Sequence, residues 1–261
     1  MKNFKRVIVV PVYNEAGSVK KVIESILVHK NADTKLILVQ DGSDDGTEKI
    51  LLQLSGYFAE NSIDLVNHSQ NHGYGKALIS GFKKALDYEN AEYILTMDCD
   101  EQHQPEDIGK FFAFRGVDIL SGSRYLMDIE KGIQAPPDRV QINKKLTEKY
   151  IRIAQNTFHE NWNLTDTFCG MKRYQRFFLE SFMDAVSNAG LNASCLGYAF
   201  PLILWNYYIF WLKQNHRHLA ESFAEMAIPK IYVSDDRTFG AHLDFPAKRY
   251  RYYLNCMKVT F

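Results

Sequence analysis

The sequence has no excess of positive or negative charge, and its cysteines are not clustered. Lys and Arg together number 31, as do Asp and Glu, so no overall field attracts the chain to nucleic acid, and we expect no nucleic-acid partner. The four cysteines, at positions 99, 169, 195 and 256, form no Cys-x-x-Cys pair and no cluster with histidines. This spacing argues against a zinc site or a disulfide framework and favours a reducing compartment.

A long apolar leader is also lacking. The apolar run at 7–10 is short, meets Pro11 and has no small-residue cleavage site, so we expect a cytoplasmic protein. Residues 191–212 contain no charged side chain, which leaves three alternatives: a buried helix, a helix on a membrane surface and a membrane span. Pro201 and several polar residues in this segment favour the buried helix. No repeat or low-complexity linker divides residues 1–261, so we expect one domain.

The first half of the sequence does contain an alternation of strand and helix patterns. The continuous apolar run at 7–10 is typical of a strand buried on both faces, and the largely apolar runs at 36–39, 63–66 and 93–97 predict further strands. The segments that follow the first three runs have apolar residues at helical spacing. This alternation predicts an α/β fold with a mainly parallel central sheet flanked by helices.

Polar loops follow all four predicted strands, at 11–15, 41–46, 71–76 and 98–104. Ligands of parallel α/β sheets bind beyond the carboxyl ends of the strands. We therefore expect these loops to form a single site.

The loop at 98–104 carries two carboxylates one residue apart, Asp98 and Asp100, followed by Gln102 and His103. Mg²⁺ and Mn²⁺ suit such a pair, because these ions take one or two carboxylates and fill their coordination with substrate phosphates and water. His103 is expected to support the ligands by hydrogen bonding. The alternative is that the two aspartates only form a turn.

The second half of the sequence is less regular. A strand is predicted at 118–120, a loop at 126–138, a helix at 139–158 and a polar loop at 164–174. The tail beyond residue 235 interleaves basic residues with tyrosines, which is typical of a solvated helix face and also suits a membrane surface.

Four motifs of the first half occur in a characteristic order. They are Val9-Val10-Pro11-Val12-Tyr13-Asn14-Glu15, Gln40-Asp41-Gly42-Ser43-Asp44-Asp45-Gly46-Thr47, Asn71-x-Gly73-x-Gly75-x-Ala77 and Asp98-x-Asp100-x-Gln102-His103. Together they resemble the family 2 glycosyltransferases, which have the GT-A (nucleotide-diphospho-sugar transferase) fold. Later motifs are similar to the dolichyl- or polyprenyl-phosphate sugar synthase branch: Gly122-Ser123-Arg124-Tyr125, the helix start at Arg139, the 166–174 loop and Asp236-Arg237-x-x-Gly240.

The resemblance implies a nucleotide-sugar-binding half at about 1–115 and an acceptor-binding half at about 116–261. In the first half it implies a GDP- or UDP-sugar donor, bound with Mg²⁺ or Mn²⁺. Asp98 would contact the donor, and Asp100 and Gln102 would hold the metal. The remaining residues implied to bind the donor are Pro11, Tyr13, Glu15, Asp41 and Lys76.

In the second half, the resemblance implies that Arg124, Arg139 and Arg237 bind phosphates of the acceptor and donor. The implied catalytic set is Asp98, Asp100, Arg124 and Asp166.

The sequence leaves two alternatives for the acceptor, a polyprenyl phosphate and a hydroxyl group. A hydroxyl acceptor needs a general base, whereas an acceptor phosphate is already ionised and needs only arginines to position it. Asp166 is the one base candidate, so we favour inverting transfer of a hexose to a lipid phosphate, by a protein that is cytoplasmic or peripheral on the cytoplasmic face of the membrane. A nucleotide-binding scaffold without catalysis is the alternative of another class.

Two features depart from the family's pattern. The family usually has two adjacent aspartates after the second strand, and here the first of them is Gln40, which leaves the base of the nucleotide open. No apolar span is evident after residue 220, so we expect a lipid acceptor to be reached from the membrane surface.

Overall fold

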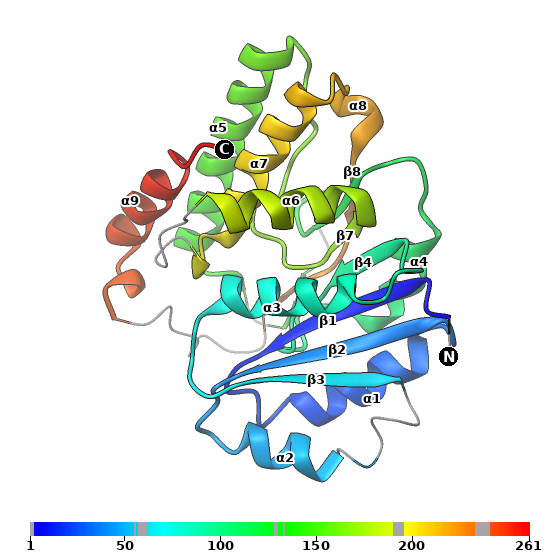
Figure 1. Cartoon of the computed structure of the whole chain (residues 1–261). Helices are drawn as coiled ribbons and strands as arrows, with labels where there is room; N and C mark the ends of the chain where they lie inside the picture. The colour runs from blue at the N-terminus through cyan, green and yellow to red at the C-terminus, as the bar shows by residue number, and fades with distance from the viewer. Residues whose placement is uncertain are drawn as a thin grey trace.

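The computed structural model describes residues 3–54, 56, 62–127, 130–132, 134–189, 196–232 and 241–261. A seven-stranded sheet with the order β3-β2-β1-β4-β7-β5-β8 runs through the molecule (Figure 1). Its strands are β1 (Arg6–Val12), β2 (Thr34–Asp41), β3 (Ile63–His68), β4 (Tyr93–Thr96), β5 (Ile119–Ser123), β7 (Lys172–Gln175) and β8 (Phe223–Ala227). All neighbouring pairs are parallel except those of β7, which confirms the expected mainly parallel α/β sheet.

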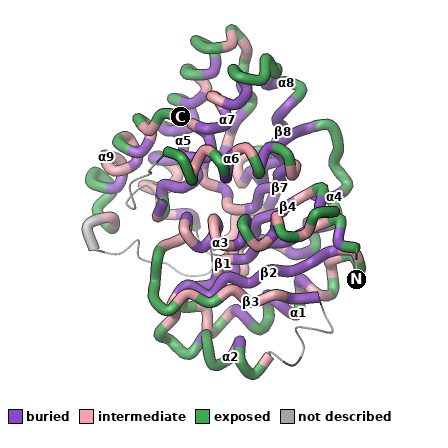
Figure 2. The backbone as a smooth tube through the Cα atoms, in the orientation of Figure 1, coloured by how far each residue is buried: buried purple, intermediate pink, exposed green. Residues whose placement is uncertain are grey.

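Helices cover both faces of this sheet because successive strand residues point to opposite sides. Val7 and Val9 of β1 belong to one core cluster, and Ile8 and Val10 belong to the other. The helices that supply buried residues to the second cluster are α1 (Val19–His29), α2 (Thr47–Leu54) and α4 (Ile108–Ala113). The longer helices that supply buried residues to the first cluster are α3 (Tyr74–Leu86), α5 (Pro137–Phe158), α6 (Arg176–Asn188), α7 (Phe200–Gln214) and α9 (Pro246–Cys256). Figure 2 shows β1 and β2 as a buried layer and the outer faces of the helices as exposed.

Five shorter elements complete the described chain. Strands β6 (Glu130–Gly132) and β9 (Lys230–Tyr232) pair in parallel as a separate two-stranded sheet. The 3₁₀ helices η2 (Pro105–Asp107) and η4 (Ala241–Asp244) precede α4 and α9, and α8 (Leu219–Ser222) precedes β8. The sequence-predicted loop at 126–138 therefore contains the short strand β6.

Helix α7 confirms the buried-helix alternative for most of the segment 191–212, of which residues 191–195 lie outside the described part. Ten of its residues are buried, and Trp205 and Tyr208 have no exposed surface. Pro201 does not interrupt the helix, because it lies in the first turn, where its missing N–H has no intrahelical partner to lose. Among the described residues, none of the helices combines the length and apolar character that crossing a membrane requires.

The sequence-predicted polar loop at 164–174 is only partly a loop. Its last residues begin β7, which inserts antiparallel between β4 and β5. Lys172 and Arg173 made the segment look polar, yet both are buried, with exposed fractions of 2% and 0%. The Arg173 guanidinium donates through its two terminal nitrogens to the backbone oxygens of Phe114 (2.8 Å) and Val117 (3.0 Å), so both of these nitrogens find partners inside the fold.

Candidate active site

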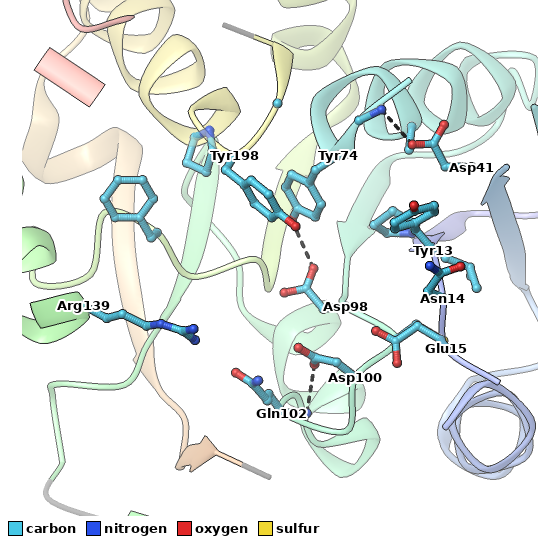
Figure 3. A pocket seen from close by; sticks show the side chains of 18 of the residues that line it. Tyr13, Asn14, Glu15, Asp41, Tyr74, Asp98, Asp100, Gln102, Arg139 and Tyr198 are labelled. Atoms are coloured by element: carbon cyan, nitrogen blue, oxygen red, sulfur yellow. Dashed lines mark hydrogen bonds between the residues drawn. The ribbon is translucent and has the colours of Figure 1, made fainter. Parts of the chain in front are cut away.

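A cleft of about 740 Å³ lies at the carboxyl ends of β1, β2 and β4, where the sequence predicted that the loops converge. Figure 3 shows Glu15, Asp98, Asp100 and Gln102 on one side of this cleft, with the guanidinium of Arg139 directed toward them from the other side. The sequence-predicted site residues that line it are Pro11, Tyr13, Glu15, Asp41, Asp98, Asp100, Gln102, Arg124 and Arg139. Lys76 and Asp166 are not among the lining residues, and Arg237 lies outside the described residues.

The loops after β1 and β2 are fixed to each other by side-chain hydrogen bonds. The Asn14 amide donates to the Asp44 carboxylate (2.8 Å) and accepts from the Asp44 backbone N–H (3.0 Å). The backbone N–H of Ala16 donates to Asp45 (3.0 Å). Asn14 has φ 53°, a left-handed conformation that asparagine tolerates better than most residues. These contacts hold Tyr13 and Glu15 at the rim of the cleft.

Asp41, at the end of β2, orders the next loop. Its Oδ1 accepts from the His72 backbone N–H (3.0 Å), and its Oδ2 accepts from that of Gly73 (2.8 Å). The distance from Nδ1 of the His68 ring to Oδ1 of Asp41 is 2.6 Å. Asp41 is 2% exposed and still lines the cleft. The carboxylate therefore positions the 71–73 backbone at the place where the resemblance implies the nucleotide base.

In the acidic segment after β4, the two aspartates have different hydrogen-bond partners. Asp98 accepts a hydrogen bond from the Tyr74 hydroxyl (3.0 Å), and Asp100 accepts one from the backbone N–H of Gln102 (3.0 Å) (Figure 3). Glu101 between them has φ 61°, so the backbone turns sharply there. This turn presents Asp98, Asp100 and Gln102 to the cleft together.

His103 supports this segment from behind. The backbone N–H of Asp98 donates to His103 Nδ1 (2.9 Å), so Nδ1 has no proton and the neutral ring carries its proton on Nε2. The 3.6 Å approach of the same Nδ1 to the Asp98 carboxylate is therefore not an ion pair. His103 is 6% exposed and does not line the cleft, which agrees with the expected supporting role.

Gly170 provides the space that Asp98 occupies. A Cβ atom at position 170 would lie 2.3 Å from Oδ2 of Asp98, much closer than a normal contact. The Gly170 carbonyl accepts from the Thr96 hydroxyl (2.7 Å), which ties this backbone to the end of β4. The glycine in the 166–174 segment therefore lets the carboxylate pack against bare backbone.

The donor atoms of the acidic segment fit a magnesium or manganese ion that is shared with a diphosphate. The described residues contain no group of three or more His, Cys, Asp and Glu side chains arranged to hold a metal by themselves. Asp100 and Gln102 supply oxygen atoms at the cleft surface, with Asp98 beside them. Ions of this kind use few protein ligands and take the remainder from substrate phosphates and water, so the small donor set suits them.

Arg124 also lines the cleft and forms a bidentate ion pair with Asp166. Its Nε and Nη2 donate to the two carboxylate oxygens at 2.7 and 2.8 Å. Burial alone would lower the pKa of the Arg124 guanidinium, but the Asp166 charge raises it well above its ordinary value. Burial likewise opposes ionisation of Asp166, but Arg124 and the hydrogen bonds bring the Asp166 pKa below its ordinary value.

The sequence suggested Asp166 as a base candidate, but the structure encloses this residue behind the cleft. It is 0% exposed and accepts further hydrogen bonds from the Asn143 amide (2.9 Å) and the Phe168 backbone N–H (3.2 Å). A base must reach the proton that it removes, and this carboxylate is enclosed by its donors. The contacts show a residue that fixes the orientation of Arg124.

Several residues of the site carry no sequence signal that we recognised. Asn143 on α5 bonds both Asp166 and the Thr167 backbone N–H (3.1 Å), and Glu225 on β8 accepts from the backbone N–H groups of Thr165 (2.9 Å) and Asp166 (3.0 Å). Long-range packing brings them together. Other lining residues not singled out from the sequence are Tyr74, Phe168, Tyr198, Tyr232, Arg249 and Tyr253.

The sheet order, the loops at the strand ends and the acidic segment together define the class of GT-A nucleotide-sugar transferases. A family model described as "Glycosyl transferase family 2" matches residues 7–182. The chain belongs to this glycosyltransferase family.

Curated relatives match parts of this chain. One is the UDP-N-acetylglucosamine–dolichyl-phosphate N-acetylglucosaminyltransferase of Methanococcus voltae, 36% identical over 113 residues, covering 40% of this chain and 44% of the relative. Another is the undecaprenyl-phosphate 4-deoxy-4-formamido-L-arabinose transferase of Photorhabdus laumondii, 28% identical over 182 residues, covering 68% and 51%. The matches thus span about half the length of these relatives.

Solved structures share the fold over most of the chain. Glucosyl-3-phosphoglycerate synthase of Mycobacterium tuberculosis, in complex with UDP, has a TM-score of 0.60 at 16% identity and covers 97% of this chain and 79% of that one. A structure of S. aureus TarS 1–349 with UDP-GlcNAc has a TM-score of 0.55 at 16% identity, covering 90% and 60%. At these identities the likeness shows the fold alone.

Proposed function

We propose that this chain transfers a hexose from a nucleoside-diphosphate sugar to a polyprenyl phosphate, with inversion at the anomeric carbon. The observation that carries the proposal is a cleft lined by Asp98 and Asp100 and by Arg124 and Arg139, with the Arg139 guanidinium directed toward the carboxylates from the other side (Figure 3). Carboxylates suit a metal-bound diphosphate, and arginines suit a second anion through their fork of N–H donors. The two curated relatives reported above bear names that include a dolichyl or an undecaprenyl phosphate, which supports the same acceptor class.

The donor side would hold the nucleotide against the 11–15 loop and the Asp41-ordered backbone, with UDP or GDP as the alternatives. Asp100 and Gln102 would hold Mg²⁺ or Mn²⁺, and Asp98 would contact the donor beside them. Structures of the mycobacterial synthase contain Mn²⁺ together with UDP, which supports a divalent ion in this fold. When bound, such an ion stabilises the negative charge that builds on the leaving diphosphate.

The acceptor side would hold the lipid phosphate so that one of its oxygens faces the anomeric carbon. A bond forms between that oxygen and the carbon, and the bond from the carbon to the donor's diphosphate oxygen breaks, with its electron pair leaving on the nucleoside diphosphate. The acceptor oxygen is already ionised near neutral pH, so no base has to remove a proton. Arg124, oriented by Asp166, and Arg139 would position the phosphate and offset its charge.

The positions of the carboxylates in the cleft favour a phosphate acceptor over a hydroxyl acceptor. Within the described part of the chain, those that line the cleft are Glu15, Asp41, Asp98 and Asp100, all in the half that we assign to the donor. Asp166 is enclosed by its partners. A hydroxyl acceptor would need a base on the acceptor side.

A ligand panel tests the donor half of the proposal. Thermal unfolding is followed with Mn²⁺ and each of UDP-glucose, UDP-N-acetylglucosamine, GDP-mannose and the free nucleotides. A bound donor raises the melting temperature by mass action, so we expect one base series to stabilise the chain and to require the metal. Absence of stabilisation by every nucleotide would contradict the proposal, and stabilisation without any sugar transfer would favour the non-catalytic scaffold.

A further inference from the structure

Helix α9 forms part of the cleft wall, although it lies beyond the segment matched by the family model. Arg249 and Tyr253, one turn apart, line the cleft and are 3% and 4% exposed. Lys248 and Arg251 on the same helix are exposed. The helix therefore directs one arginine into the cleft and its other cations to the surface.

The position of Arg249 is fixed by contacts at both ends of α9. Near the start of the helix, its guanidinium forms an ion pair with Asp138 in the first turn of α5 and donates to the Leu243 carbonyl (3.1 Å). At the other end, the Asn206 amide of α7 donates to the carbonyls of Cys256 (3.2 Å) and Val259 (3.0 Å). Both ends are thus held to the helices beneath, so Arg249 is pre-organised at the wall.

Arg249 lies close to the other groups of the acceptor side. Asp138, its partner, directly precedes Arg139, and both arginines line the cleft. The Tyr253 and Phe168 rings have centroids 4.8 Å apart, and both residues line the cleft. Two guanidinium groups beside two aromatic rings form a surface that suits an anionic head joined to an apolar chain.

We propose that Arg249 binds the acceptor phosphate together with Arg139, and that Phe168 and Tyr253 contact the first isoprene unit. This inference rests on the proposed function, because it assumes a phosphate on the acceptor. Asp138 has a positioning role: it holds the Arg249 guanidinium at the wall and offsets the repulsion between the two arginines. The phosphate then meets a fork that is already oriented, so less side-chain entropy is lost on binding.

The test uses farnesyl phosphate, a short prenyl phosphate that needs no membrane, with binding to the full chain measured by calorimetry in the presence of Mn²⁺ and whichever of UDP and GDP stabilises the wild type. Arg249→Ala removes a charge-assisted contact, so we expect Kd to rise roughly tenfold to a hundredfold. Arg249→Lys keeps the charge without the fork and should have a smaller effect. Arg251→Ala, which removes an exposed arginine of the same helix, is the matched control and should change Kd less than about twofold.

Stabilisation by the same nucleotide and Mn²⁺ shows whether each variant is folded, and if Arg249→Ala is not, Arg249→Lys carries the test. The inference is overturned if the wild type binds farnesyl phosphate and the Arg249 variants bind it equally well. It is also overturned if Arg251→Ala weakens binding as much as Arg249→Ala, because overall charge would then explain the effect. If the wild type ignores farnesyl phosphate and transfers sugar to a prenyl alcohol, the proposed function itself has failed.

Discussion

Arg124 and Asp166 form a bidentate ion pair in which the carboxylate has no exposed surface and the arginine borders the cleft. The pair joins β5 to the 164–171 segment, and Asn143 adds a contact from α5. An arginine side chain has many rotamers, and these contacts leave Arg124 one orientation. The structure thus explains why an aspartate that looks catalytic in the sequence lies behind the site.

Replacing Asp166 by Asn should destabilise the fold and impair use of the acceptor. The change leaves the buried Arg124 charge without its counter-charge, and breaking a buried pair costs about 3–5 kcal/mol of unfolding free energy. Asp33→Asn, which breaks the more exposed Arg6–Asp33 pair (2.8 Å), is the control and should cost less than about 1 kcal/mol. Urea denaturation of both variants measures the difference. Equal losses would contradict the structural importance of the Arg124–Asp166 pair.

Asp100→Ala should abolish transfer and leave the fold intact. Asp100 is the carboxylate that we assign to the metal, and charge stabilisation by such an ion is worth several kcal/mol, so we expect turnover to fall at least about a hundredfold. Glu106→Ala removes an exposed carboxylate from the same segment and should change little. Transfer rates across a Mn²⁺ titration, with melting temperatures of both variants, test the assignment. Full turnover by Asp100→Ala would rule it out.

Gly170→Ala should weaken donor use by displacing Asp98. The added Cβ would lie 2.3 Å from Asp98 Oδ2, so the carboxylate or the backbone has to move. A displacement of about 1 Å at a reacting site can cost about a hundredfold in rate. Gly109→Ala is the control, because a Cβ there meets no atom within 4 Å. Steady-state kinetics with varied donor should separate the two variants, and unchanged kinetics in both would show that the position of Asp98 is unimportant.

Stability should fall with rising pH because of Glu225. Burial raises the pKa of Glu225 to about 7, although hydrogen bonds from Thr165 and Asp166 oppose the shift. Between pH 4.5 and about 7 the folded state keeps the Glu225 proton, whereas the unfolded state, in which the pKa has its ordinary value near 4.5, has released it. The contribution of Glu225 to the free energy of unfolding is therefore fully present below pH 4.5 and is lost as the pH rises through about 7. We expect the wild type to lose roughly 1–3 kcal/mol of unfolding free energy between pH 5 and 8 relative to Glu225→Gln. Parallel pH profiles of the two proteins would contradict this.

The sequence was sufficient to predict the frame of the site. Largely apolar segments predicted β1 to β4, because strands inside a sheet that is covered on both faces are rich in apolar residues. The loop convergence followed from the parallel order alone. The acidic segment was recognised because two carboxylates one residue apart after a buried strand suit a shared cation.

The acceptor side could be predicted only in part, for physical reasons. Strand β7 was missed because Lys172 and Arg173 made its sequence look exposed, while the Lys172 ammonium and the terminal nitrogens of Arg173 donate to backbone oxygens inside the fold. Asp166 was assigned a chemical role because a sequence does not show burial. Arg249 was one basic residue among several in the tail, and only the packing of α9 distinguishes it from Arg251.

The central claim is that the acceptor is a lipid phosphate, and paired acceptors test it most directly. The full chain is supplied with Mn²⁺, the nucleotide sugar that stabilises it, and either undecaprenyl phosphate or undecaprenol in the same detergent. We expect sugar to appear on the phosphate and not on the alcohol, and Arg124→Ala to lose this transfer while donor binding persists. Transfer to the alcohol at a rate equal to or above that of the phosphate, or an unaffected Arg124→Ala variant, would contradict the account.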